Sequence, residues 1–579
     1  MTDQFSTEQQ EYLKGFMSGV EARRGSIAPA AASTSDPTDL QRTAQDRTVS
    51  EGGKLTPEEE AKRKRNPLDR TDEISKLAAE GRFPKGTDVF LTKYHGLFYV
   101  APAQDSFMCR MRVPGGIMSA AQFHGVADLA EDLGGGFVDL TTRANLQVRE
   151  LPATAAPEVL NRLAELGLTS RGSGADNIRN VTGSPTAGID PQELIDTRPH
   201  ARAIHYHILN HRELYGLPRK FNIAFDGGGR VPVLEDTNDI AFSAVTVEPG
   251  HGVEPGVYYA LALGGITGHS DFARGTGAIV PPNETTAVCD AVLRVFIANG
   301  DRTSRKTSRL KYLLDRWGHP RFIEEVEGQL GRKLLRTPPE ALQPRPTQEK
   351  HGHVGVHAQR QPGLQYVGVV CPVGRLTCEQ ARGLAGIANR YGSGTVRLTV
   401  WQNLLLSDIA EADMPAVLEA IAALGLGWEA SALRGGLVAC TGNAGCKFAA
   451  SDTKRHATEL VDWLEPRVAV AYPVNIHLTG CHNSCAQHLV GDIGLLGAKV
   501  DQGGEDTVEG YDLHVGGGAG PEQRIGRLIR PAIAFPDLPP LVLTLLQAWS
   551  AGDPGQTFQQ WSAARSDAEL QSMLDGAAA

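Results

Sequence analysis

The stretch FMCRMRVPGGIMSAAQFHGVADLAEDLGGGFVDLTTRANLQV, residues 107–148, returns in diverged form as QYVGVVCPVGRLTCEQARGLAGIANRYGSGTVRLTVWQNLLL, residues 365–406. Identical residues match at a constant offset, among them Pro114 with Pro372, Gly116 with Gly374, Gln122 with Gln380, Thr141 with Thr399, and Asn145 with Asn403. Each copy has the pattern of a strand, a turn with Pro and Gly, an amphipathic helix, a Gly-rich turn and a second strand. The sequence therefore predicts a duplicated β-α-β module.

The repeat extends beyond these two segments in a looser form. Residues 181–184 (VTGS) echo residues 440–443 (CTGN), and residues 221–227 (FNIAFDG) echo residues 474–480 (VNIHLTG). The first copy carries cationic residues where the second carries cysteines, so the two copies have diverged in chemistry. Duplicated modules commonly pack about a pseudo-two-fold axis, which leaves a cleft for a large cofactor between them.

Four of the eight cysteines lie in two turns of the second copy: Cys440, Cys446, Cys481 and Cys485. A cubane iron–sulfur cluster needs one soft thiolate for each of its irons, and this set supplies them. The neighbours Gly442, Gly445 and Asn483 are small, which lets backbone N–H groups approach cluster sulfides. A structural zinc site and unrelated buried thiols are the alternatives that the spacing leaves open.

Cationic residues gather in five short segments, residues 110–112, 142–149, 177–180, 219–222 and 302–311. Arg110 and Arg112 alternate within an apolar strand, so we expect them to point to the same face. Lys220 and Asn222 alternate in the same way. Any one of these cations could be a plain surface charge, but buried cations need anionic partners. The set therefore predicts an anion-binding cleft.

The pattern C-T-G-N-x-x-C followed by G-C-x-N-S-C resembles the sirohaem-containing ferredoxin–nitrite reductases and their sulfite reductase relatives. The resemblance covers about residues 90–525. It implies that Cys440, Cys446, Cys481 and Cys485 hold a [4Fe-4S] cluster and that Cys485 also bridges to the sirohaem iron. One departure is His482, which stands where the family usually has proline.

The resemblance implies an α+β fold: a pseudo-two-fold duplicated module with ferredoxin-like half-domains plus two cofactor-binding α+β domains. The expected boundaries are 1–85 for a partly irregular N-terminal arm, 86–170 for the first half-domain, 171–345 for the sirohaem and substrate domain, 346–432 for the second half-domain, and 433–579 for the cluster domain with a C-terminal extension. The charged run at residues 58–65 reads as part of a solvated arm; the alternative is a segment that wraps the body or docks a partner.

The family motifs also imply roles for single residues. Arg110, Arg179 and Lys220 are expected to bind the substrate anion at the iron, with Asn222 as a neutral hydrogen-bonding partner. The residues expected at the cofactor are Arg112, Arg143, Gln147, Arg219, Arg305, Lys306, Arg309, Asn483 and Cys485. Some relatives cross-link a tyrosine to a cysteine five residues before the distal arginine; Gly174 stands there, which excludes that cross-link.

Lys220-Phe221-Asn222 favours nitrite over sulfite as the substrate. The sulfite reductases of the family have Lys-x-Lys here, and a second ammonium suits a dianion better than the monoanion nitrite. The expected reaction is the six-electron reduction of nitrite to ammonia, and ferredoxin-dependent reduction of sulfite to sulfide is the alternative. No G-x-G-x-x-G opens a helix after a strand, so we expect an external one-electron donor such as ferredoxin. A protein that kept the cluster and lost the tetrapyrrole would have lost these cations, and this chain retains them.

Composition places the chain among ordinary globular proteins of two to four domains, with 579 residues, 41% hydrophobic and 21% charged. The net charge of −10 argues against nucleic-acid binding. The absence of a long apolar run predicts no membrane span, and the absence of a signal core predicts a cytoplasmic protein. We also expect a monomer. The cysteines outside the cluster show no disulfide-like spacing, which fits a reducing compartment.

Overall fold

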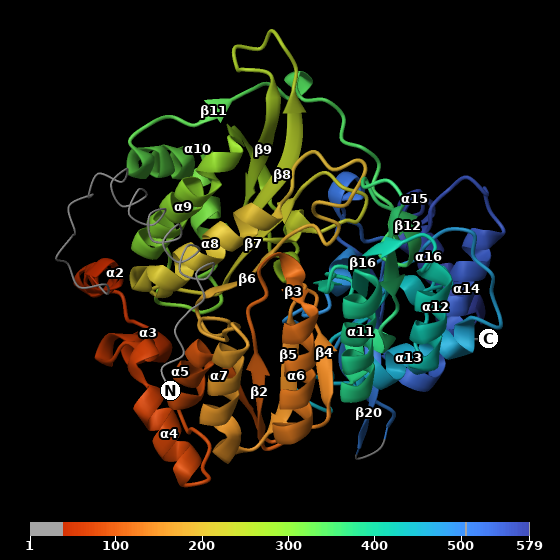
Figure 1. Ribbon diagram of the computed structural model, residues 1–579, viewed down its shortest axis with the longest axis horizontal. Coiled ribbons are helices and arrows are strands. Elements are labelled where there is room, and N and C mark those ends of the chain that lie inside the picture. Colours follow the sequence, from red (N-terminus) through yellow and green to blue (C-terminus); the bar gives the residue numbers. More distant parts are fainter. Residues whose placement is uncertain (1–38, 504–505, 578–579) are drawn as a thin grey trace, which may run out of the picture.

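The computed structural model describes residues 39–503 and 506–577 (Figure 1). Residues 1–38 of the expected N-terminal arm lie outside this range. The described residues form four β-sheets. None of the described helices is long and apolar enough to cross a membrane.

Two five-stranded sheets contain the two copies of the repeat. The first has the order β1 (Leu97–Val100), β2 (Ser106–Arg110), β5 (Leu146–Leu151), β4 (Phe137–Leu140) and β14 (Arg375–Thr377). The second has the order β12 (Gly355–Ala358), β13 (Leu364–Val369), β16 (Leu404–Ala410), β15 (Thr395–Leu398) and β3 (Ile117–Ser119). Each repeat copy therefore lends one short strand to the sheet of the other copy.

This exchange joins the two half-domains into one body. β3 pairs antiparallel with β15, and β14 pairs antiparallel with β4. Helices α6 (Ala120–Leu133) and α11 (Cys378–Tyr391), one from each copy, pack against each other (Figure 1). Both begin with the same capping box, in which the side chains of Gln122 and Gln380 accept from the N-cap backbone. The two amides then donate to the carbonyls of Leu166 and Leu424 at 3.1 and 3.2 Å, which repeats one contact at symmetric positions.

The two remaining sheets share a second topology. One has the order β6 (Ile178–Thr182), β7 (Phe221–Asp226), β8 (Ile240–Val247), β9 (Gly256–Leu263), β10 (Arg274–Val280) and β11 (Leu335–Arg336). The other has the order β17 (Leu437–Ala439), β18 (Ile476–Thr479), β19 (Ile493–Asp501), β20 (Thr507–Val515) and β21 (Arg527–Ala534). In both, the first three strands are parallel and the following strands antiparallel. The looser repeat seen in the sequence thus corresponds to a duplicated sheet.

Helices cover these sheets and complete the cores. The half-domains contain α7 (Ala156–Glu165) and α12 (Met414–Ala423). The first larger sheet is covered by α8 (Arg198–Asn210), α9 (Thr285–Asn299) and α10 (Leu310–Leu330). The second is covered by α13 (Thr453–Leu464), α14 (Leu538–Ser550), α15 (Phe558–Ala563) and α16 (Asp567–Ala577). One apolar core runs through both half-domains, and each larger sheet has its own.

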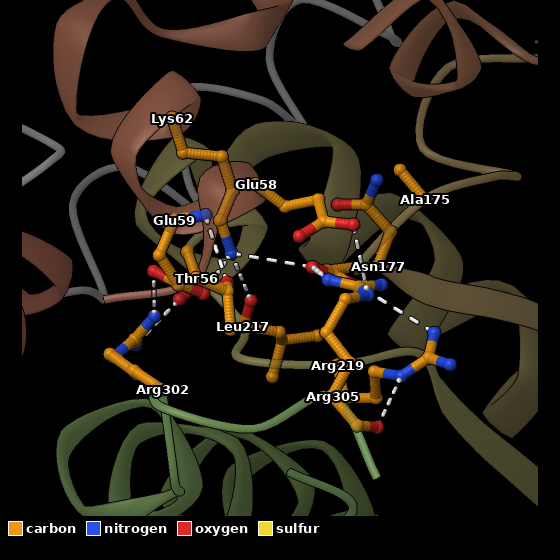
Figure 2. A network of polar contacts seen from close by, with 12 residues as sticks. Thr56, Glu58, Glu59, Lys62, Ala175, Asn177, Leu217, Arg219, Arg302 and Arg305 are labelled. Atoms are coloured by element: carbon orange, nitrogen blue, oxygen red, sulfur yellow. Dashed lines mark hydrogen bonds and ion pairs between the residues drawn. The ribbon is translucent and has the colours of Figure 1, made fainter. Parts of the chain in front are cut away.

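The described part of the N-terminal arm folds onto the body, which corrects the expectation of a solvated charged run. It forms α2 (Asp39–Ser50), α3 (Pro57–Lys64), α4 (Thr71–Ala79) and α5 (Asp88–Thr92). Glu59 and Lys62 of α3 are only 1% and 4% exposed. Arg302 donates to Glu59 at 2.8 Å, and Lys62 lies 3.5 Å from the buried carboxylate of Asp176 (Figure 2). The charges are buried because each one finds an opposite charge on the body.

This network also reaches segments that carry predicted site residues. Lys62 donates to the carbonyl of Leu217 at 2.9 Å, two residues before Arg219. Arg305 makes a bidentate contact to Asp176 at 2.8 and 2.9 Å (Figure 2). The arm therefore ties the loops before β6 and β7 to the loop before α10.

We expect Lys62→Met to destabilise the protein by about 3 kcal/mol, because the change leaves two buried carboxylates with one fewer cation. Urea unfolding measures the effect. Lys64→Met, on the exposed side of the same helix, is the matched control and should stay within about 0.5 kcal/mol of the wild type. Equal stability of the two variants would contradict a structural role for this network.

Candidate functional site

A cavity of about 450 Å³ lies where both half-domains and both larger sheets meet. The first larger sheet faces it with the amino-terminal ends of β6 and β7, which bear Arg179 and Asn222. The second faces it with the carboxyl-terminal ends of β17 and β18, after which Cys440 and Cys481 follow. The cavity thus uses opposite ends of two equivalent sheets, which explains why one copy of the repeat supplies cations and the other thiols.

The lining of this cavity is strongly cationic. Among the described residues that line it, Asp139 is the one carboxylate. The cationic lining residues are Lys93, Arg110, Arg143, Arg149, Arg179, Arg219, Lys220, Arg305, Arg309, Lys447 and Lys454. This excess of positive charge in a partly dry cavity favours a polyanionic occupant.

Several of these cations are held by carboxylates outside the lining. Arg309 contacts Asp239 at 2.7 Å, and Arg305 and Arg219 lie 2.8 and 3.8 Å from Asp176. Burial, followed by the charge of the neighbouring Arg305, lowers the pKa of Arg219 to about 10. Ion pairs of this kind fix the direction of a guanidinium, so these arginines form a rigid wall.

Arg110 and Arg179 have no carboxylate partner within the described residues. Arg179 donates to the carbonyl of Ala175 at 2.8 Å and to that of Ser173. The guanidinium of Arg110 stacks on the Phe98 ring, 4.6 Å from its centroid. With its amide oxygen turned toward Arg110, Gln147 accepts from Nε and Nη2 at 3.2 and 3.1 Å.

Burial acts on the pKa of both arginines. It lowers the pKa of Arg110 to about 10, although the nearby Cys485 thiol raises it. Burial, followed by the charge of Arg110, holds the pKa of Arg179 well below its usual range. Neutral acceptors orient the two guanidinium groups without cancelling their charge, so both can attract an anion.

Lys220 and Asn222 occupy the start of β7. Within the described residues, the Lys220 amine has no hydrogen-bond or ion-pair partner. Burial, and next the charge of Arg309, hold its pKa well below the usual value. Asn222 donates through its backbone N–H to Asp239 Oδ2 at 2.8 Å and through its amide Nδ2 at 3.3 Å. Asp239 therefore holds both Asn222 and Arg309.

All four predicted cluster cysteines line the opposite part of the cavity. The backbone N–H of Gly480 donates to Cys440 Sγ at 3.2 Å, and the Asn483 amide donates to Cys481 Sγ at 3.5 Å. Cys485 is exposed to the cavity, and the Thr142 hydroxyl donates to its carbonyl at 2.8 Å. Thiols that already accept backbone and amide N–H groups suit an iron–sulfur cluster.

The positions of the four thiols favour an iron–sulfur cluster over the alternative of a structural zinc site. Tetrahedral zinc requires its ligands to converge on one point at about 2.3 Å. In the described ranges, no three His, Cys, Asp or Glu side chains converge in that way. A cubane spreads its four thiolates over four irons, so it fits separated thiols.

Gly442 shows why this turn needs glycine. Its φ of 72° lies in the left-handed region, and a Cβ atom would lie 2.6 Å from the backbone nitrogen of Thr453. The turn between Cys440 and Cys446 therefore packs against the start of α13. This packing fixes the two thiols relative to each other.

Two predicted cofactor residues lie elsewhere. Arg112 does not line the cavity; it is 1% exposed and donates to the carbonyls of Ile178 and Arg179 at 2.8 and 3.2 Å. Because β2 ends at Arg110, the alternation that would place both arginines on one face stops there. Lys306 is exposed and also lies outside the lining, since it belongs to an irregular turn. The other predicted site residues all line the cavity.

Lys93, Lys447 and Lys454 line the cavity and are absent from the sequence prediction; Arg149 also lines it, and the sequence analysis placed it in a cationic segment without giving it a role. Arg149 donates to the Gly445 carbonyl at 3.1 Å and to the Thr441 hydroxyl at 2.9 Å, so it braces the cysteine turn. Arg149 lies two residues after the predicted Gln147 in β5, so strand alternation places both side chains on the same face. This alternation could have identified Arg149 as a cavity residue. Lys93 stands alone in an N-terminal segment and gave no signal.

Two family models match the chain. The nitrite and sulphite reductase 4Fe-4S domain matches residues 174–334 and 431–559. The nitrite/sulfite reductase ferredoxin-like half domain matches residues 100–166 and 357–424. The chain therefore belongs to the nitrite and sulfite reductase family, and the α+β fold with its duplicated half-domains is confirmed.

Particular relatives are similar over most of their length. The ferredoxin–nitrite reductase of Synechococcus elongatus is 37% identical over 503 residues, which cover 85% of this chain and 96% of that protein. That of Leptolyngbya laminosa is 39% identical over 469 residues, or 78% and 88%. The structure of the Mycobacterium tuberculosis NirA protein superposes with a TM-score of 0.83 at 30% identity and covers 90% of this chain and 99% of that one.

Proposed function

We propose that the protein reduces nitrite to ammonia with electrons from ferredoxin, at a sirohaem bridged to a [4Fe-4S] cluster. The observation that carries the proposal is a single cavity with four thiols on one wall and cations without carboxylate partners on another. The relatives named above are ferredoxin–nitrite reductases. Reduction of nitrite to ammonium consumes six electrons and eight protons and releases two waters, so the site must bind an anion and admit protons.

The donor set suits both cofactors. Sirohaem is a polycarboxylate macrocycle, and Arg143, Arg219 and Arg309 are directed into the cavity by fixed partners. Cys440, Cys446, Cys481 and Cys485 would hold the cluster, with Cys485 shared with the sirohaem iron. When bound, this pair supplies single electrons and a coordination site for the substrate.

The chain's own residues would bind and orient the anion. Arg110, Arg179 and Lys220 supply positive charge that is preorganised in the cavity and costs little reorganisation during the reaction. Their depressed pKa values would rise when an anion binds, because the anion favours the charged forms. Nitrite binding therefore favours protonation of these groups, which supports affinity at low pH and weakens it as pH rises through the depressed values.

Asn222 supports nitrite over sulfite, the second candidate substrate. An amide at this position adds no charge, and Asp239 already neutralises Arg309 beside it. The charge balance at this position therefore favours binding of a monoanion over a dianion.

Asn222→Lys is expected to raise the ratio of kcat/KM for sulfite to that for nitrite by about three- to tenfold, because a dianion gains more from an added cation. The upper value is limited since Asp239 would share its charge with the new ammonium. Asn222→Met is the neutral control of similar length. An unchanged ratio in an Asn222→Lys variant that keeps its sirohaem would contradict a selective role for Asn222.

The stoichiometry of the reaction tests the proposed function. We expect six equivalents of reduced ferredoxin to be oxidised for each ammonium formed from nitrite. Release of a partly reduced nitrogen compound with fewer equivalents would contradict the proposal.

We further propose that the protein acts as a cytoplasmic monomer, without nucleic-acid or membrane partners, as the sequence predicts.

A further inference from the structure

Lys93 is one of six cationic lining residues that have no carboxylate beside them in the described structure. Arg149, Arg219, Arg305, Arg309 and Lys454 all lie within 3.8 Å of a carboxylate oxygen. Within the described residues, the Lys93 amine has neither a hydrogen bond nor an ion pair, although the side chain is half-buried in the cavity wall. In this respect Lys93 matches Lys220, a proposed substrate residue.

The surroundings of Lys93 place it beside the arginines assigned to the substrate. Its amine lies 5.8 Å from the centroid of the Phe98 ring, the same ring on which Arg110 stacks at 4.6 Å. Residues 173–175, whose carbonyls orient Arg179, pack directly against Lys93. A Cβ atom on Gly174 would lie 2.4 Å from the Lys93 carbonyl oxygen and 2.7 Å from Phe98 Cζ. Gly174 therefore allows the Lys93 segment to approach Arg179.

We propose that Lys93 is a further substrate-binding residue, whose ammonium contacts the nitrite anion together with Arg110 and Arg179. This inference rests on the proposed function. Three cations that share the Phe98 ring and the 173–175 turn converge on one part of the cavity, and none has a carboxylate partner in the described structure. An anion is the missing partner for all three.

The ionisation of Lys93 agrees with this role. Burial, followed by the charges of Arg179, Lys447 and Arg305, lowers its pKa to about 8, against the opposing effect of Asp176. Arg110 is a further cation on the same Phe98 ring. A bound anion would raise the pKa of Lys93, so binding above pH 8 takes up a proton. The contribution of Lys93 to affinity would then be constant below that pH and fall above it.

The test is the dissociation constant of nitrite for the resting holoenzyme, followed by the change in visible absorbance between pH 6.5 and 9.5. Lys93→Met should raise this constant about tenfold at pH 7 and flatten its rise above pH 8. Lys93→Arg should restore affinity and show a smaller rise above pH 8 than the wild type, because its charge persists there. Lys85→Met, an exposed lysine nearby, should match the wild type. Sirohaem per chain and the thermal midpoint should be unchanged in all variants.

The outcomes separate this inference from the proposed function. If the wild type binds nitrite and Lys93→Met binds it equally well, Lys93 is not a substrate residue and the proposed function stands. If Lys93→Met folds with its normal midpoint but lacks sirohaem, Lys93 anchors a cofactor carboxylate and the inference is overturned. If the wild-type holoenzyme does not bind nitrite, both proposals fail.

Discussion

Replacing Arg179 or Lys220 by alanine is expected to lower turnover with nitrite by about 10²–10³-fold, the loss found when one preorganised electrostatic donor is removed. Neither side chain pairs with a carboxylate in the described structure, so each change removes positive charge that only an anion could use. The measurement is kcat and KM for nitrite with a reduced viologen dye. Because a preorganised cation also stabilises negative charge that develops on the substrate during reduction, we expect kcat to fall along with kcat/KM.

Two measurements make this result specific to the substrate. Arg390→Ala, an exposed cation on α11, should keep wild-type kinetics. Sirohaem content should be unchanged in Arg179→Ala and Lys220→Ala. A folded variant that lacks sirohaem would show that the residue anchors the cofactor, and wild-type turnover would show that the cavity does not need that charge.

Cys485→Ser is expected to lower nitrite turnover by more than about a hundredfold, since loss of an outer-shell partner alone costs about 10–100-fold. A hard oxygen replaces a soft thiolate at the ligand shared by cluster and sirohaem. Iron and sulfide content, with the visible and electron paramagnetic resonance spectra, measure the loss of cluster and of coupling. Cys378→Ala, a buried thiol of α11 outside the cavity, is the control. A coupled spectrum with near-normal activity in Cys485→Ser would remove the bridge assignment.

The repeat and the cysteines carried most of what the sequence could predict. A strand, turn and helix pattern that occurs twice specifies the half-domains, because it is local and periodic. The echo of residues 221–227 in 474–480 predicted that the duplication extends further, and the two segments form equivalent strands, β7 and β18, of the two larger sheets. The exchange of β3 and β14 could not be foreseen, since a three-residue strand does not encode which sheet it joins.

The errors concern residues whose setting depends on distant partners. The sequence predicted that Glu59 and Lys62 belong to a solvated charged run. They are buried because they form ion pairs with Arg302 and Asp176, which are distant in the sequence. Arg112 read as a cavity residue because alternation was extended past the end of β2. Lys93 carries no motif at all, and it became visible only once Gly174 and Phe98 were placed beside it.

Side-by-side assays of nitrite and sulfite with the same reduced viologen dye test the central claim most directly. We predict that kcat/KM for nitrite exceeds that for sulfite by at least about tenfold, because one fewer cation suits a monoanion. A sulfite value equal to or above the nitrite value, in enzyme with full sirohaem and cluster content, would contradict the account and identify the cavity as a sulfite site.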